Sequence, residues 1–218
     1  MKNIASLIDH TLLKPSTKKQ IVALCREAMQ YKFASVCILP DYVKLAKKTL
    51  VGSGVKVCTV VGFPLGENTT QTKVFETKNA VKNGAEEIDM VINLSWAKGN
   101  EWKKVSKEIA AVVKAAKGAL VKVIIETCLL DKKKIVKACL ACVEGGAQCV
   151  KTSTGFSLCG AKAEDIVLMA ETLKGSGLFI KASGGIRDKA AAMAMIEAGA
   201  QRLGTSSGVK IVDEGSNV

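Results

Sequence analysis

Two lysines lie at corresponding places in the chain and could carry out carbonyl chemistry together. Lys151 ends a short apolar run ahead of a glycine-containing loop, and Lys181 lies about thirty residues on, ahead of a Gly-Gly pair. A neutral lysine amine attacks a carbonyl to form a Schiff base, and a second, protonated lysine can donate protons to the intermediate. The pattern therefore indicates covalent catalysis, provided that the two lysines lie on neighbouring strands.

The elements that must position these lysines follow an alternating pattern. Apolar runs typical of strands fall at residues 6–11, 34–39, 55–62, 87–93, 121–127, 148–152, 178–183 and 202–205. Segments of helical spacing fall at 17–31, 42–51, 71–83, 96–117, 132–144, 163–173 and 188–197. The order predicts an α/β fold in which residues 1–218 form one (β/α)8 TIM barrel with a short C-terminal helix. An open doubly wound sheet is the alternative, but its usual nucleotide motifs, GxGxxG and GxxxxGK[ST], are missing.

Strand alternation predicts which side chains face the barrel interior. Asp89, Lys151 and Lys181 all fall on the inward face, near the strand ends where barrel active sites form. Two ammonium groups roughly 5 Å apart repel by about 3 kcal/mol at an effective dielectric of about 20. We therefore expect one of the two lysines to be partly neutral near pH 7. The alternative is that a lysine simply binds a substrate phosphate or pairs with an acid such as Glu126, which the same alternation turns inward.

Two loops have the composition of a phosphate site. Gly184-Gly185 follows the seventh predicted strand, and Ser206-Ser207 follows the eighth. Glycine lets backbone amides approach an anion closely, and the loops after strands seven and eight commonly bind phosphate in this fold. The pair of loops predicts a phosphorylated substrate.

Composition excludes several classes of function. The net charge is +12, but only three of the 32 basic residues are arginines, so we expect no nucleic-acid partner. The N-terminus has no signal-like segment and no apolar run reaches the roughly twenty residues of a membrane span, so we expect a cytoplasmic protein without a membrane partner. The eight cysteines are scattered, which favours free thiols, and Cys139 and Cys142 fall in a helical segment as core residues. With His10 as the single histidine, we expect no metal site.

Seven motifs together resemble the deoxyribose-phosphate aldolases, class I aldolases with a barrel fold. They are IDHTLLKP at 8–15, SVCILP at 35–40, VGFPLG at 61–66, EIDMVIN at 87–93, VKVIIET at 121–127, VKTSTGF at 150–156 and IKASGGIR at 180–187. The resemblance implies reversible cleavage of 2-deoxy-D-ribose 5-phosphate into acetaldehyde and D-glyceraldehyde 3-phosphate. It also implies that the enzyme needs no metal or other cofactor, and that a homodimer is possible.

The same resemblance implies a role for individual residues. Lys151 is the Schiff-base lysine, Lys181 is the second lysine that perturbs it, and Asp89 shuttles protons with a bound water. The phosphate-binding positions are Gly155, Gly184, Gly185, Ser206 and Ser207, and the residues near the second lysine are Asp9 and Thr11. Some members carry a phosphate-contacting lysine directly after TSTG, where this chain has Phe156, and Lys162 is a candidate replacement. Some members also end in a tyrosine that reaches the site, whereas this chain ends at Val218.

Three further residues have weaker signals. Cys37 is at a strand end, where we hypothesise that it reacts with an aldehyde. His10 is expected to be packed or hydrogen-bonded, and Lys122, near the start of its strand, to lie at the opposite mouth of the barrel with a structural role. Two functions remain as alternatives: another phosphosugar barrel aldolase or isomerase, and a basic nucleic-acid-binding scaffold.

Overall fold

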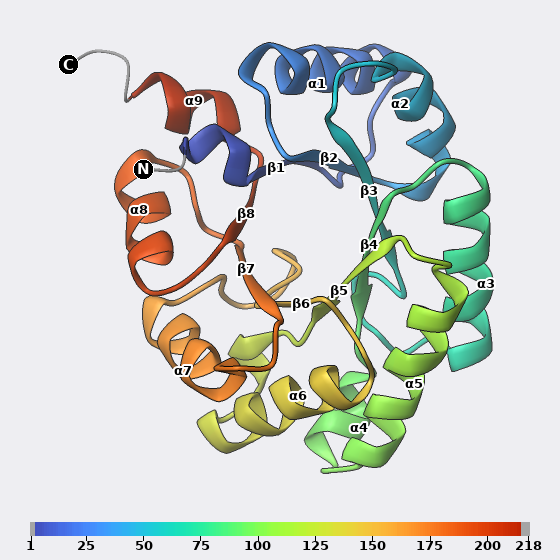
Figure 1. The fold of residues 1–218 in the computed structure, drawn as a ribbon, viewed down its shortest axis with the longest axis vertical. Helices are drawn as coiled ribbons and strands as arrows, with labels where there is room; N and C mark the ends of the chain where they lie inside the picture. Colours follow the sequence, from blue (N-terminus) through green and yellow to red (C-terminus); the bar gives the residue numbers. More distant parts are fainter. Residues whose placement is uncertain (1–2, 215–218) are drawn as a thin grey trace.

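Eight parallel strands pair in chain order, and the last pairs with the first to close a barrel (Figure 1). The computed structural model describes residues 3–214. The strands are β1 (Ile8–Leu12), β2 (Ser35–Ile38), β3 (Lys56–Val61), β4 (Glu87–Val91), β5 (Leu120–Ile124), β6 (Cys149–Lys151), β7 (Phe179–Ser183) and β8 (Arg202–Thr205). This closed sheet confirms the predicted (β/α)8 barrel.

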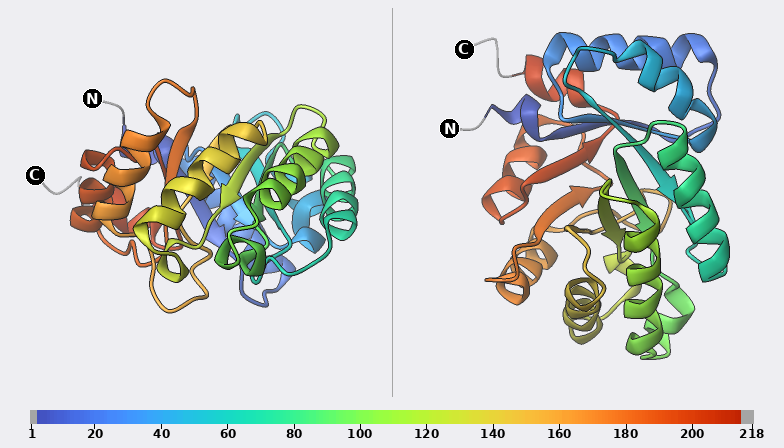
Figure 2. Two further views of the ribbon diagram at one scale, coloured as in Figure 1. Left: turned by 90° about the horizontal axis from the view of Figure 1, so that it is seen from below. Right: turned by 45° about the vertical axis from the view of Figure 1, so that its right-hand side comes forward.

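Helices form an outer ring around the strands (Figure 2). They are α1 (Lys18–Tyr31), α2 (Val43–Thr49), α3 (Thr70–Lys82), α4 (Leu94–Lys98), α5 (Trp102–Ala115), α6 (Lys132–Glu144), α7 (Ala163–Leu173), α8 (Lys189–Glu197) and α9 (Gly208–Asp213). Three 3-10 helices accompany them: η1 (Ile4–Leu7), η2 (Pro40–Tyr42) and η3 (Thr127–Leu129). The short α9 confirms the predicted C-terminal helix. None of the helices described here has the length and apolar character needed to cross a bilayer.

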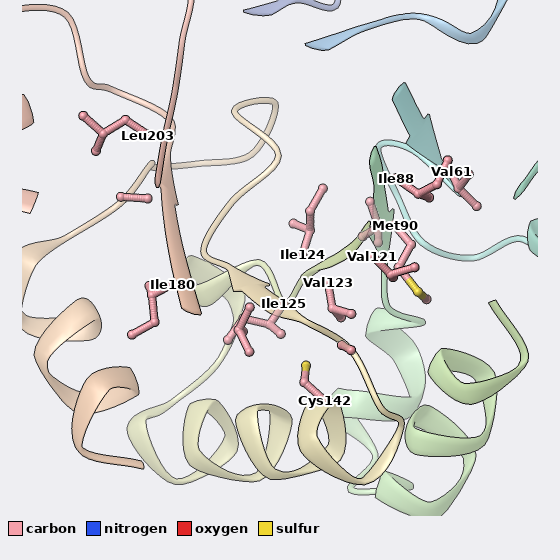
Figure 3. Close-up of a cluster of buried hydrophobic side chains, with 14 of the residues drawn as sticks. Val61, Ile88, Met90, Val121, Val123, Ile124, Ile125, Cys142, Ile180 and Leu203 are labelled. Atoms are coloured by element: carbon pink, nitrogen blue, oxygen red, sulfur yellow. The ribbon is translucent and has the colours of Figure 1, made fainter. Parts of the chain in front are cut away.

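The main core fills the space between the strands and the helices. Figure 3 shows Ile88 and Met90 of β4 with Val121 and Val123 of β5 among these buried side chains. Parallel strands are covered on both faces, so every second residue packs under a helix while the residues between face the barrel interior. The inward positions are therefore free to carry polar groups.

The first predicted strand begins two residues too early. Ser6 lies in η1, and β1 starts only at Ile8. The side chain of Asn3 accepts a hydrogen bond from the backbone of Ala5 at 3.1 Å, which closes the 3-10 turn. Such a local side-chain bond competes with strand pairing, and apolar periodicity does not reveal it.

The predicted helix 96–117 is two helices. α4 ends at Lys98, and Asn100 has a left-handed backbone with φ of 61°, so α5 starts again at Trp102. Asn93, predicted at the end of a strand, instead caps α4 by accepting a hydrogen bond from the backbone of Trp96 at 2.9 Å. The fifth strand is also shorter than predicted, because Glu126 has φ of 52° and turns the chain into η3.

Candidate active site

Lys151 and Lys181 are directly paired across adjacent strands. The register of β6 and β7 places Lys151 opposite Lys181, and both side chains are buried. Each Nζ donates a hydrogen bond to the same oxygen, Oδ2 of Asp89, at 2.8 Å. One carboxylate from β4 therefore holds the two amines together.

A wider set of ionic groups surrounds this triad and fills the barrel interior. Asp9 of β1 forms an ion pair with Lys181, with Oδ2 2.5 Å from Nζ, and its Oδ1 accepts a hydrogen bond from Arg202 Nη1 at 2.7 Å. Lys122 of β5 donates to Asp89 Oδ1 at 2.8 Å and pairs with Glu87 Oε2 at 2.6 Å. We call this set the interior charge network: Asp9, Glu87, Asp89, Lys122, Lys151, Lys181 and Arg202. It has one more basic group than it has carboxylates.

The position of Lys122 corrects a prediction. Lys122 was expected at the opposite mouth of the barrel, yet the register of β4 and β5 pairs it with Asp89. β5 runs from Leu120 to Ile124 rather than over 121–127, so Lys122 is its middle residue and is level with Asp89, the middle residue of β4. Lys122 shares the inward face of Glu126 at a spacing of four residues, but the bounds of the strand were not readable from apolar spacing. Sequence reasoning also missed Glu87 and Arg202, although Glu87 shares the inward face of Asp89 at a spacing of two residues.

The network sets the charge of its members. Burial alone would raise the pKa of Asp89, but Lys122, Lys151 and Lys181 hold it well below its usual range. Burial alone would lower the pKa of Lys181, but Asp89 and Asp9 raise it well above its usual range. Asp89 is thus ionised and Lys181 protonated at neutral pH. The simple picture of two lysines repelling each other is incomplete, because a carboxylate lies between them and Lys181 keeps its proton.

A cavity of about 470 Å³ opens at the strand ends above the network. Lys151 is the one member of the network that lines it, whereas Asp9, Asp89 and Lys181 lie beneath. Thr11, near the end of β1, also lines this cavity. A carbonyl compound in the cavity would therefore meet the amine of Lys151 first.

The predicted phosphate loops form one side of the cavity. Four of the five predicted positions line it, namely Gly155, Gly184, Gly185 and Ser206. Gly155 and Gly185 have φ of 85° and 79°, which only glycine adopts readily, and the space beside each is open. Ser207 does not line the cavity; its backbone donates to the Thr205 hydroxyl at 2.9 Å.

Phe156, the residue directly after the TSTG motif, makes an apolar contact at the cavity. Phe156 lines the cavity and packs edge-on against Phe63, with ring centroids 5.3 Å apart. The candidate replacement, Lys162, does not line the cavity; it is exposed, and its nearest carboxylate is Glu164 at 4.0 Å. The geometry therefore does not support Lys162 as the replacement phosphate contact.

Among the described residues, Glu126 is not the acid that pairs with the two lysines; Asp89 and Asp9 are. The carboxylate of Glu126 accepts from the hydroxyl of Thr154 at 2.5 Å and from the Thr154 backbone at 3.2 Å. Within residues 3–214 it has no ion pair, and burial raises its pKa. Glu126 thus fixes Thr154, which precedes the phosphate loop at Gly155.

Two cysteines lie beside the charge network. Cys37 of β2 is fully buried, with Sγ 4.0 Å from Asp89 Oδ2, and Cys58 of β3 has Sγ 3.1 Å from Asp89 Oδ1. These three donors are close enough to hold a metal ion. The ammonium groups of Lys122, Lys151 and Lys181 already bond the Asp89 oxygens and would repel a divalent cation, so the donor set does not suit one. The reactivity of Cys37 toward aldehydes stays a prediction.

The remaining sequence candidates are structural. His10 is buried and its Nε2 lies 2.7 Å from Glu27 Oε2, as expected for a hydrogen-bonded histidine. Cys139 and Cys142 are buried on α6, and the eight cysteines are free thiols. The chain end at Ser216–Val218, compared above with the tyrosine tail, lies outside the described residues.

Comparisons with known proteins agree with the motifs. A model of the DeoC/LacD family aldolases matches residues 4–214. Deoxyribose-phosphate aldolases of Geobacillus sp. (strain WCH70) and Clostridium tetani (strain Massachusetts / E88) are 59% and 57% identical over 213 residues; each match covers 97% of this chain, and 95% and 98% of those proteins. The structure of a tetrameric deoxyribose phosphate aldolase from Aeropyrum pernix superposes with a TM-score of 0.92 at 37% identity, covering 98% of this chain and 91% of that one. The chain belongs to the DeoC/LacD family of aldolases.

Proposed function

We propose that the chain is a class I aldolase that reversibly cleaves 2-deoxy-D-ribose 5-phosphate into acetaldehyde and D-glyceraldehyde 3-phosphate. One observation carries the proposal: Lys151 lines a cavity with phosphate loops while its Nζ bonds Asp89, which also binds the protonated Lys181. The names of the similar proteins support the choice of substrate.

The first step is attack of Lys151 on the aldehyde carbon, C1, of the open-chain sugar. Lys151 suits this role because its ionic contact is with a single carboxylate, whereas Lys181 contacts Asp9 and Asp89, and Lys122 contacts three carboxylates. The addition forms a carbinolamine, which loses water to become an iminium ion. Lys181 is the proton donor for the departing water, and Asp89 passes protons between the two amines.

The second step breaks the bond between C2 and C3. The iminium nitrogen accepts the electron pair of this bond, leaving an enamine of acetaldehyde on Lys151. The proton of the C3 hydroxyl goes through a bound water to the Asp89 carboxylate, so that C3 becomes the aldehyde carbon of glyceraldehyde 3-phosphate. Protonation of the enamine at C2 and hydrolysis then release acetaldehyde and restore the amine.

Borohydride trapping tests this proposal. Reduction of the iminium in the presence of 2-deoxyribose 5-phosphate should add mass to the protein at Lys151, as read by peptide mass spectrometry. Lys151→Ala should give no adduct and no cleavage, and Lys181→Leu should form the adduct more slowly because the proton donor is missing. Lys162→Met, an exposed lysine outside the cavity, is the matched control and should behave like the parent protein. An adduct on another lysine, or cleavage by Lys151→Ala, would contradict the assignment.

Metal removal tests the cofactor proposal. The electron sink of this reaction is the iminium nitrogen, so no Lewis acid is required. Exhaustive dialysis against EDTA should leave the cleavage rate unchanged, and metal analysis of the dialysed protein should find less than one equivalent. Loss of activity that returns with a divalent cation would show that the Schiff-base mechanism is not the whole chemistry.

A further inference from the structure

The charged side chains known to line the cavity of Lys151 are all basic. Among residues 3–214, two cations besides Lys151 line it, Lys14 and Arg187, and no carboxylate does. Neither Lys14 nor Arg187 has an ion pair within 4 Å among the residues that the structure describes. Free cations around a cavity without acids favour an anionic ligand.

The barrel topology places these two cations on either side of one phosphate loop. β8 pairs with β7 on one edge and with β1 on the other. Arg187 follows β7 and Lys14 follows β1, so the loop after β8, which contains Ser206, lies between them. A phosphate held by the loops after β7 and β8 would therefore have Lys14 on the side opposite Arg187.

The backbone around Lys14 is held firmly in place. Leu13 is buried in the small interior cluster with Cys37, Cys58 and Val60, and it anchors the end of β1. Pro15 disfavours the helical conformation for Lys14. The Ser16 hydroxyl donates to the Lys14 carbonyl at 2.7 Å, and the Tyr42 hydroxyl donates to the Ser16 carbonyl. The loop is thus ordered while the Lys14 side chain stays exposed at the cavity.

We propose that Lys14 is a specificity-determining residue whose ammonium group binds the substrate phosphate from the β1 side of the cavity. The inference rests on the proposed function for the identity of the substrate. It fits the apolar Phe156, since the loop after β6 brings no cation to the cavity. Lys14 does not take part in bond breaking; it selects phosphorylated over unphosphorylated sugars.

The test compares two substrates that differ only in the phosphate. Lys14→Met should lower kcat/KM for 2-deoxyribose 5-phosphate about ten- to a hundred-fold, as for loss of a charge-assisted hydrogen bond. The change should appear in KM, and kcat/KM for 2-deoxyribose should be unchanged. Lys14→Arg should keep the preference for the phosphorylated sugar, and Lys162→Met should match the parent protein. An equal effect of Lys14→Met on both substrates, or no effect on either, would overturn the proposal.

A binding experiment separates this proposal from the aldolase assignment. Inorganic phosphate, titrated into the unreacted protein at low salt and followed by calorimetry, should bind the parent protein and bind Lys14→Met at least about ten-fold more weakly. If the parent protein cleaves neither sugar, the proposed function fails, yet the phosphate titration still decides the role of Lys14. Equal phosphate affinity in the parent and the variant would overturn the role of Lys14 even if cleavage is found.

Discussion

At the scale of single residues, Asp89 organises the site. Its two oxygens accept hydrogen bonds from three lysines on three different strands, each at 2.8 Å. Burying such charges is costly unless each is paired, so the groups hold one another in position. In the proposed mechanism Lys181 is the proton donor, and the carboxylates beneath the cavity keep it protonated.

The pKa of His10 can be measured directly, because His10 is the single histidine of the chain. Burial lowers the pKa of His10 from 6.5, against the opposing effect of Glu27. A folded-state pKa below the unfolded value means that the unfolded chain binds the proton more tightly. Stability from this group is therefore complete above the unfolded pKa and is lost as the pH falls below it. NMR titration of the one imidazole should give a midpoint below 6.5.

A variant isolates this contribution. The free energy of unfolding of the parent protein, from urea denaturation, should fall between pH 7.5 and pH 5. His10→Gln should show a smaller fall over the same range, since its side chain does not titrate. A His10 midpoint at or above 6.5 would refute the assignment.

At the scale of elements, a second buried ion pair supports the strand that carries Asp89. Lys73 of α3 and Glu108 of α5 are fully buried and 2.9 Å apart. Lys73 Nζ also donates to the carbonyl of Val91 at the end of β4, and Glu108 accepts from the backbone of Asn93 at 3.1 Å. Side chains of α3 and α5 thus hydrogen-bond the backbone at the end of β4, where Val91 lies two residues beyond Asp89.

Removing one partner of this ion pair should lower the free energy of unfolding more than removing both. Lys73→Met leaves Glu108 buried without its cation and should lower the free energy of unfolding by about 3–5 kcal/mol. The double variant Lys73→Met, Glu108→Leu removes both charges and should recover part of that loss. Urea denaturation of the three proteins measures the difference. If the double variant were less stable than Lys73→Met, the loss of stability in Lys73→Met would not come from the unpaired charge of Glu108.

At the scale of the whole molecule, the charge of +12 and the acid-free cavity should attract an anionic substrate. The Debye length falls from about 30 Å at 0.01 M salt to about 8 Å at 0.15 M, so this attraction is screened. kcat/KM for 2-deoxyribose 5-phosphate should fall over that range, while kcat/KM for neutral 2-deoxyribose should stay constant. If kcat/KM declined equally for both sugars, the salt would be acting on the protein itself and not on the electrostatic attraction of the substrate.

The homodimer expected from the family stays a prediction.

Much of this molecule was readable from the order of its residues. Apolar periodicity is a local property, so it predicted the succession of strands and helices and the inward faces of Asp89, Lys151 and Lys181. The loops at Gly184-Gly185 and Ser206 were recognisable because glycine and serine have specific backbone roles next to an anion. The breaks at Ser6 and Asn100 were not, because they depend on single side-chain caps and a left-handed residue.

Only the tertiary structure decided how high each strand stands in the barrel and which loops become neighbours. Register between strands is set by closure of the whole sheet, which no single segment encodes. That closure made Lys122 level with Asp89, removed Glu126 from any lysine by bonding it to Thr154, and left Lys162 outside the cavity. The pairing of β8 with β1 likewise brought Lys14, from the first part of the chain, to the same cavity as Ser206 in the loop after β8.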